Sequence, residues 1–79
     1  MKTIFIDTGA FLAKELARDQ HHQRALDLWK ELVKGRTLLY SSEHVLDETA
    51  TLLARRTTYA WATDWGKDVL EASIQWLQA

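Results

Sequence analysis

Two short apolar runs, Thr3–Ile6 and Thr37–Tyr40, constrain the fold of this chain most strongly. Each is a continuous stretch of β-branched, aliphatic or aromatic residues, which predicts a buried strand. Each run is followed by two segments with helical periodicity. Parallel strands need a crossover of about a dozen or more residues, which helices usually supply. The order of strand, two helices, strand and two helices therefore predicts an α/β fold with a parallel sheet and helix pairs as crossovers.

The two helices between the strands are indicated by apolar spacing and by end signals. Ala10–Ala17 places its apolar residues on one face, and Thr8 is the expected cap of this helix. A polar break at Arg18–His22 follows, in which Asp19 is the expected cap of the next helix. That helix ends at Lys34 and Gly35, as helices often do. Its apolar stripe comprises Ala25, Leu28, Trp29, Leu32 and Val33.

Two further helices and a terminal strand are expected after the second run. The third helix begins after Ser41–Ser42, either of which is a suitable cap, and continues to Arg55–Arg56. Thr57–Thr58 starts a fourth helical segment. Gly66 within that segment costs about 1 kcal/mol relative to Ala. Apolar alternation over Ser73–Ala79 favours a strand over an extension of the helix.

Composition narrows the classes of protein to which this chain can belong. The 79 residues include no Cys and carry a net charge of −1, which excludes a disulfide scaffold and any broad attraction for nucleic acid. No apolar run approaches the roughly 18 residues of a membrane span. We therefore expect a soluble, cytoplasmic protein of at most one domain that does not bind membranes. A chain of this length buries only about 60–65% of its unfolded surface. Four Trp residues are therefore many bulky aromatic side chains for so small a core.

Asp7 and Glu48 are the two carboxylates whose positions are most informative. Asp7 directly follows the first apolar run, and ligands of parallel sheets gather beyond the carboxyl ends of the strands. Its alternative role is that of a turn residue favourable to the dipole of the following helix. Glu48 shares a helix face with Val45 and Leu52, where a charge is costly unless it is paired, metal-bound or beside a cleft. The alternative is a Glu48 that reaches solvent or pairs with an Arg, with Asp47 as the more solvent-facing neighbour.

Taken together, the two carboxylates suggest a site for a hard divalent cation. Mg²⁺ and Mn²⁺ prefer oxygen ligands and retain waters. Metal-assisted hydrolysis of phosphodiesters usually needs more acidic ligands than two. The spacing of Asp7 and Glu48 by itself is therefore only a weak indication of catalysis.

The remaining polar and aromatic clusters have simpler explanations. His21–His22 indicates a solvated helix start rather than a metal site, because no neighbouring ligand pattern completes it. Arg55–Arg56 with Tyr59 either contacts a phosphate backbone or favours the dipole at its helix end. The four Trp side chains are expected in the core or at an interface.

Three segments of the chain resemble the PIN domain family, in particular its small VapC-like toxins. Ile4–Ala13 is similar to the family's first strand and signature Asp-Thr/Ser, and Asp19–Leu32 resembles its second helix. Leu39–Leu53 is similar to its second strand and Glu-bearing helix. The resemblance covers most of the chain. It implies an α/β, PIN-like fold over residues 1–79, as a single partial domain that is incomplete at the C-terminus.

The resemblance also implies an activity and roles for particular residues. PIN domains are Mg²⁺- or Mn²⁺-dependent ribonucleases that use a cluster of carboxylates. Asp7 matches the first acid and Glu48 the second, which implies catalytic and metal-binding roles for both. Thr8 matches the supporting hydroxyl residue beside the first acid. The family's further acids lie in later strands and helices, and Asp64 and Asp68 do not match them.

Two functions of different class follow from these observations. The first is a Mg²⁺- or Mn²⁺-dependent endoribonuclease of the toxin–antitoxin type, with RNA as substrate, an antitoxin-like partner and only part of the acidic site in this chain. The second is a non-catalytic, helix-rich module that binds an antitoxin-like protein or self-associates as a homodimer or higher oligomer. Exposed Trp side chains would suit such a contact, and the Trp-rich end of the chain would then face either a partner or the absent part of a larger domain. Further Asp residues, downstream or in a second chain, would favour the first function.

Overall fold

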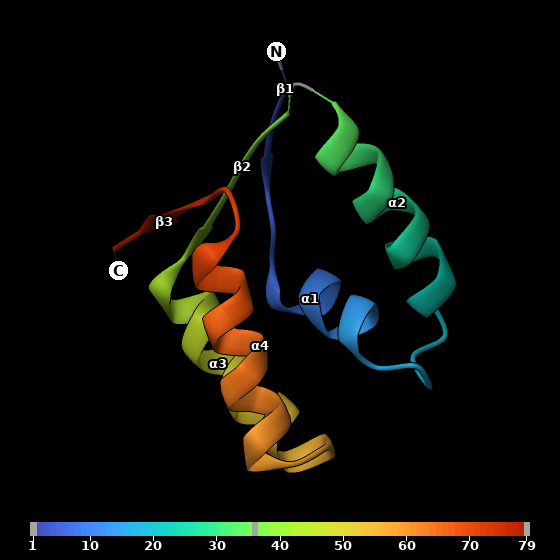
Figure 1. The fold of residues 1–79 in the computed structure, drawn as a ribbon, viewed down its shortest axis with the longest axis vertical. Helices are drawn as coiled ribbons and strands as arrows, with labels where there is room; N and C mark the ends of the chain where they lie inside the picture. Colours follow the sequence, from blue (N-terminus) through green and yellow to red (C-terminus); the bar gives the residue numbers. More distant parts are fainter. Residues whose placement is uncertain (1, 36, 79) are drawn as a thin grey trace.

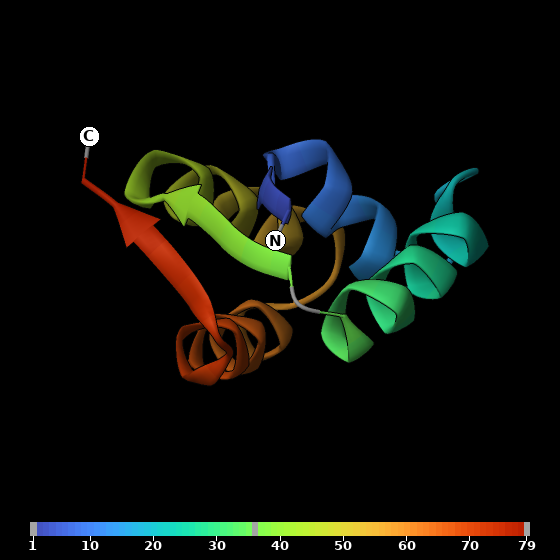
Figure 2. The ribbon, with the colours of Figure 1, turned by 90° about the horizontal axis from the view of Figure 1, so that it is seen from above.

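The computed structural model describes residues 2–35 and 37–78, which form a parallel three-stranded sheet and four helices (Figure 1). The strand order is β1-β2-β3. Figure 2 shows the α1–α2 pair beside β1 and the α3–α4 pair beside β2 and β3. The expected α/β class with helix pairs as crossovers is thereby confirmed. In chain order the elements are β1 (Lys2–Phe5), α1 (Thr8–Glu15), α2 (His22–Lys34), β2 (Thr37–Ser42), α3 (Glu43–Arg56), α4 (Tyr59–Glu71) and β3 (Ile74–Leu77).

β1 is less buried than its apolar sequence predicts. The run Thr3–Ile6 predicts a fully buried strand, but β1 lies at an edge of the sheet and pairs only with β2. Phe5 is 44% exposed, whereas Ile6, just beyond the strand, is buried. The prediction of full burial is wrong because an apolar run does not reveal whether a strand has one neighbour or two.

Asp7, and not Thr8, caps α1. Asp7 has the extended backbone of an N-cap residue, and its Oδ1 accepts a hydrogen bond of 3.0 Å from the Ala10 N–H. Thr8 is already the first residue of the helix. Its hydroxyl is therefore not needed at the cap and reaches another element of the fold.

α2 begins without the expected side-chain cap. The N-cap residue is His21, which makes no side-chain capping bond, so the prediction that Asp19 caps this helix is wrong. Asp19 instead accepts a hydrogen bond of 2.8 Å from the His21 N–H in the preceding turn. The ring of His22 bonds to the Ala13 carbonyl at 2.8 Å and ties α2 to α1.

The apolar stripe of α2 is only partly covered. No residue of this helix is buried, and Leu28 and Val33 are exposed among the described residues. Trp29 packs against the core, with the Lys14 ammonium 5.1 Å from the centre of its ring. α2 is therefore attached to the fold along one part of its stripe while another part faces outward.

α3 and α4 begin at side-chain caps that match the sequence. Ser42, rather than Ser41, caps α3 by accepting a hydrogen bond of 3.2 Å from the Val45 N–H. Thr58 caps α4 by accepting one of 3.0 Å from the Trp61 N–H. None of the helices in the described ranges is long and apolar enough to cross a membrane.

The core lies where α1, α3 and α4 meet the sheet, and it contains some of the Trp side chains. Trp65 is buried and meets Phe11 edge to face at 5.4 Å, while Trp76 stacks on Phe11 at 6.3 Å. Trp61 is half-exposed. The Trp-rich end is thus largely core, contrary to the expectation of a contact surface. The buried apolar residues that form the core cluster are Ile6, Phe11, Leu12, Leu39, Val45, Leu53, Ala62, Trp65, Val69 and Ile74.

Replacing Gly66 with Ala should stabilise the fold. α4 runs without interruption through Gly66, and a Cβ at that position would meet no heavy atom within 4 Å. Ala is favoured over Gly within a helix by about 1 kcal/mol, so we expect Gly66→Ala to raise the free energy of unfolding by about that amount. Urea denaturation followed by circular dichroism measures the change. An unchanged or lower free energy would show that the glycine is needed at this position.

Changes at Asp7 should separate its capping role from its charge. Asp7→Ala removes the acceptor for the Ala10 N–H and should lower the free energy of unfolding by about 1 kcal/mol. Asn caps helices about as well as Asp, so Asp7→Asn should cost less. Denaturation of the two variants side by side gives the comparison. Equal losses would mean that the side-chain cap contributes nothing beyond the negative charge.

Candidate functional site

The candidate site lies at the carboxyl ends of β1 and β2. The two strands are parallel, with Phe5 paired to Tyr40, so both end at the same edge of the sheet. Figure 1 shows β1 leading into α1 and β2 leading into α3 at that edge. Asp7 lies in the first of these connections, and Glu48 lies on α3. Parallel sheets generally bind their ligands at such an edge.

A hydrogen bond between side chains joins the two halves of the site. The Thr8 hydroxyl donates to Oε1 of Glu48 at 2.6 Å, across 40 residues of sequence. This places Glu48 beside the residue that follows Asp7. The hydroxyl of Thr8 thus holds one oxygen of the Glu48 carboxylate.

Each acid is held by one of its two oxygens. Oδ1 of Asp7 accepts from the Ala10 N–H, and Oε1 of Glu48 accepts from Thr8. Within the described part of the chain, these bonds leave Oδ2 of Asp7 and Oε2 of Glu48 as available acceptors. Such an arrangement orients a carboxylate while keeping a ligand atom for a cation or a water.

The charges of the site are uncompensated within the described residues. Asp7 and Glu48 are both exposed. The salt bridge found among the described residues joins Lys14 to Glu15 at 2.9 Å, and neither site acid has a basic partner there. Two carboxylates held on neighbouring elements without a counter-ion attract a cation. Their oxygen atoms, with the Thr8 hydroxyl, suit a hard ion such as Mg²⁺ or Mn²⁺ that keeps part of its hydration.

The acid pair is not part of a larger cluster of ligands in the described ranges. No group of three or more His, Asp or Glu side chains gathers there to hold a metal, so Asp64 and Asp68 do not complete the site. The sequence predicts that Asp47 faces solvent more than Glu48 does. In the structure both side chains are exposed. The apolar stripe on α3 therefore passes beside Glu48 without burying it.

The structure adds one residue to the site that the sequence did not reveal. Ser41 is completely buried, and its hydroxyl donates to the Ile6 carbonyl at 2.6 Å, directly before Asp7. From the sequence, Ser41 is only an alternative cap for α3. The bond spans 35 residues, so no local pattern reveals it.

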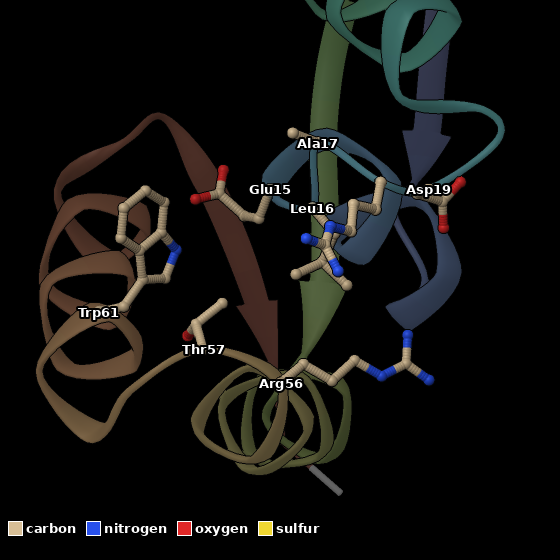
Figure 3. A pocket seen from close by; sticks show the side chains of 8 residues that line it. Glu15, Leu16, Ala17, Asp19, Arg56, Thr57 and Trp61 are labelled. Carbon is tan, nitrogen blue, oxygen red and sulfur yellow. The ribbon is translucent and has the colours of Figure 1, made fainter.

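The other sequence candidates lie apart from the acid pair. A pocket of about 420 Å³ opens at the far end of α1, beside the α3–α4 connection (Figure 3). Arg56 reaches this pocket and Tyr59 is strongly exposed, while His22 is occupied by its bond to α1. The pocket contains neither site acid, so we treat it as a separate surface feature. It is lined by Glu15, Leu16, Ala17, Arg18, Asp19, Arg56, Thr57 and Trp61.

No family model matches the chain, and no curated protein matches it. Among solved structures, the chain is similar to VapC20 of Mycobacterium tuberculosis, described as a toxin that cleaves the sarcin–ricin loop. The TM-score is 0.79 at 30% sequence identity, and the match covers 94% of this chain. The chain spans 55% of the length of that toxin. The PIN-like α/β fold expected from the sequence is confirmed by this match to a VapC toxin.

Proposed function

We propose that Asp7 and Glu48 are part of the acidic site of a Mg²⁺- or Mn²⁺-dependent endoribonuclease of the PIN type. The observation that carries this proposal is the hydrogen bond from Thr8 to Glu48. It brings an acid on α3 beside Thr8, the residue next to the acid that follows β1. Both acids follow strands that end at the same edge of a parallel sheet, where ligands generally bind.

Each residue has a distinct part in the proposed mechanism. Asp7 and Glu48 would hold the ion through the oxygens that their hydrogen bonds leave available, and Thr8 fixes the Glu48 carboxylate by its other oxygen. When bound, Mg²⁺ or Mn²⁺ supplies charge neutralisation for a phosphodiester and acidifies its water ligands. Two carboxylates are too few to organise this reaction. We therefore propose that further acids come from a longer protein or from a second chain.

The likeness to VapC20 supports the class of function rather than its details. That protein is described as a toxin that cleaves the sarcin–ricin loop. An RNA substrate and an antitoxin-like partner are accordingly part of the proposal for this chain. The match spans 55% of the toxin, which agrees with a site that needs residues beyond those of this chain.

RNA cleavage tests the proposal directly. A longer protein that contains these residues and supplies the further acids should hydrolyse single-stranded RNA when Mg²⁺ or Mn²⁺ is added. Asp7→Asn should abolish cleavage, because it removes the charge of the first acid while keeping a good helix cap. Glu48→Gln should do the same. The 79-residue chain alone should bind the metal weakly and show no turnover. Gel analysis of a labelled RNA measures all of these reactions.

Asp47→Asn is the matched control for the RNA assay. Asp47 is exposed on the same helix, one residue before Glu48 and about 100° around it. Its loss of charge should leave cleavage unchanged. Equal cleavage by Asp7→Asn and the unmodified protein would refute the assignment of the acids. Robust metal-dependent cleavage by the 79-residue chain itself would refute the need for further acids.

A non-catalytic interaction module is the second candidate function, and one observation favours it. Large apolar side chains remain exposed on several elements, with Tyr59 at 81% and Val33 at 62%. A separate groove of about 560 Å³ runs between α3 and α4 and includes Tyr59 and Leu70. Exposed apolar surface of this kind is typical of sites that bind another protein.

Sedimentation velocity tests this second function. If the exposed apolar side chains form a contact surface, the purified chain should sediment as a dimer or larger species at micromolar concentration. Tyr59→Glu should shift the distribution toward monomer, because a charge at a contact opposes association. A single monomeric species at all concentrations would count against self-association.

A further inference from the structure

The hydrogen bonds of Ile6 show how the residue before Asp7 is held. Its N–H donates to the Tyr40 carbonyl at 2.9 Å, which continues the pairing of β1 with β2 by one bond. Its carbonyl accepts from the Ser41 hydroxyl at 2.6 Å. Both backbone groups of Ile6 are therefore tied to consecutive residues of β2 at the point where the chain leaves the sheet.

Ser41 is suited to holding this carbonyl rigidly. It is completely buried, so water does not compete for the bond, and an unpaired carbonyl at this place would be costly. The next residue along the strand, Ser42, caps α3. Two adjacent serines of β2 thus hold the two elements of the acid pair: Ser41 fixes the chain just before Asp7, and Ser42 fixes the start of the helix that carries Glu48.

We infer that Ser41 is a positioning residue, whose buried hydroxyl sets where Asp7 presents its carboxylate relative to Glu48. This inference rests on the proposed function for its consequence in metal binding. Its structural part, the positioning of Asp7 by Ser41, does not rest on the proposed function. In the described part of the chain the Ser41 hydroxyl bonds to the Ile6 carbonyl and to neither carboxylate, so it acts through the backbone of Ile6. Without the Ser41 hydroxyl, the connection between β1 and α1 should loosen while the remaining caps stay in place.

Amide hydrogen exchange of Ser41→Ala tests the structural part in the metal-free protein. The Ala10 N–H reports the cap made by Asp7, and the Trp61 N–H reports the cap of α4. Loss of the Ser41 bond should speed exchange of the Ala10 amide by about tenfold relative to the Trp61 amide. Equal acceleration of both amides, or none, would show that Ser41 does not position Asp7. If Ser41→Ala does not fold, Ser41→Cys, with its weaker donor, is measured in the same way and judged by the same outcomes.

Thr49→Val is the matched control for deletion of a buried hydroxyl. Thr49 is also completely buried, but its hydroxyl has no hydrogen-bond partner among the described residues. Val has nearly the same shape as Thr and replaces the hydroxyl with a methyl group. We expect exchange of the Ala10 amide to be unchanged relative to the Trp61 amide in this variant. If Thr49→Val speeds exchange of the Ala10 amide as much as Ser41→Ala does, any change in the core loosens the cap made by Asp7. That result would overturn the inference.

Calorimetric titration with Mn²⁺ tests the consequence for the site. Ser41→Ala should weaken Mn²⁺ binding by about 10-fold, as loss of an outer partner of a metal ligand does, while Thr49→Val should leave it unchanged. Equal affinity of Ser41→Ala and the unmodified chain would overturn the inference. No Mn²⁺ binding at all by the unmodified chain would instead contradict the weak metal site proposed for Asp7 and Glu48 in this chain, and the exchange comparison would still decide the role of Ser41.

Discussion

The parallel pairing of β1 with β2 is the constraint on which the candidate site depends. Its register aligns Phe5 with Tyr40, so the chain turns into α1 and into α3 at the same edge of the sheet. A shift of the register by one residue would turn the side chains of β2 to the opposite faces. Ser41 would then leave the core and lose the Ile6 carbonyl. The register thus determines both the burial of the sheet and the approach of Thr8 to Glu48.

Local features of the fold could be predicted from the sequence, and features that depend on distant partners could not. The order of strands and helices, a serine cap for α3 at Ser41 or Ser42 and the strand near the C-terminus follow from periodicity and cap chemistry within a few residues. The burial of β1 depends on how many strands lie beside it. Asp7 displaces Thr8 as the cap because Thr8 already has helical geometry and bonds to α3, which no local pattern contains.

The candidate site was predictable only in part, for the same reason. The position of Asp7 after a strand suggested a site, but Glu48 gained its role from the family resemblance and not from spacing. The bond between Thr8 and Glu48 joins residues 40 positions apart, and the bond from Ser41 to Ile6 joins residues 35 apart. Both bonds exist only because the sheet brings the ends of β1 and β2 together. A site that is assembled from distant short segments in this way can be recognised only from the three-dimensional structure.

We propose above all that Asp7 and Glu48 bind one divalent cation between them. Paramagnetic broadening by Mn²⁺ in a proton–nitrogen correlation spectrum tests this most directly, because broadening falls off steeply with distance from the ion. We expect substoichiometric Mn²⁺ to broaden the amide signals of Asp7, Thr8 and Glu48 first, and Mg²⁺ to restore them by competition. Broadening that begins elsewhere, at Asp64 and Asp68 for example, or that spreads evenly over the exposed acids, would contradict the account.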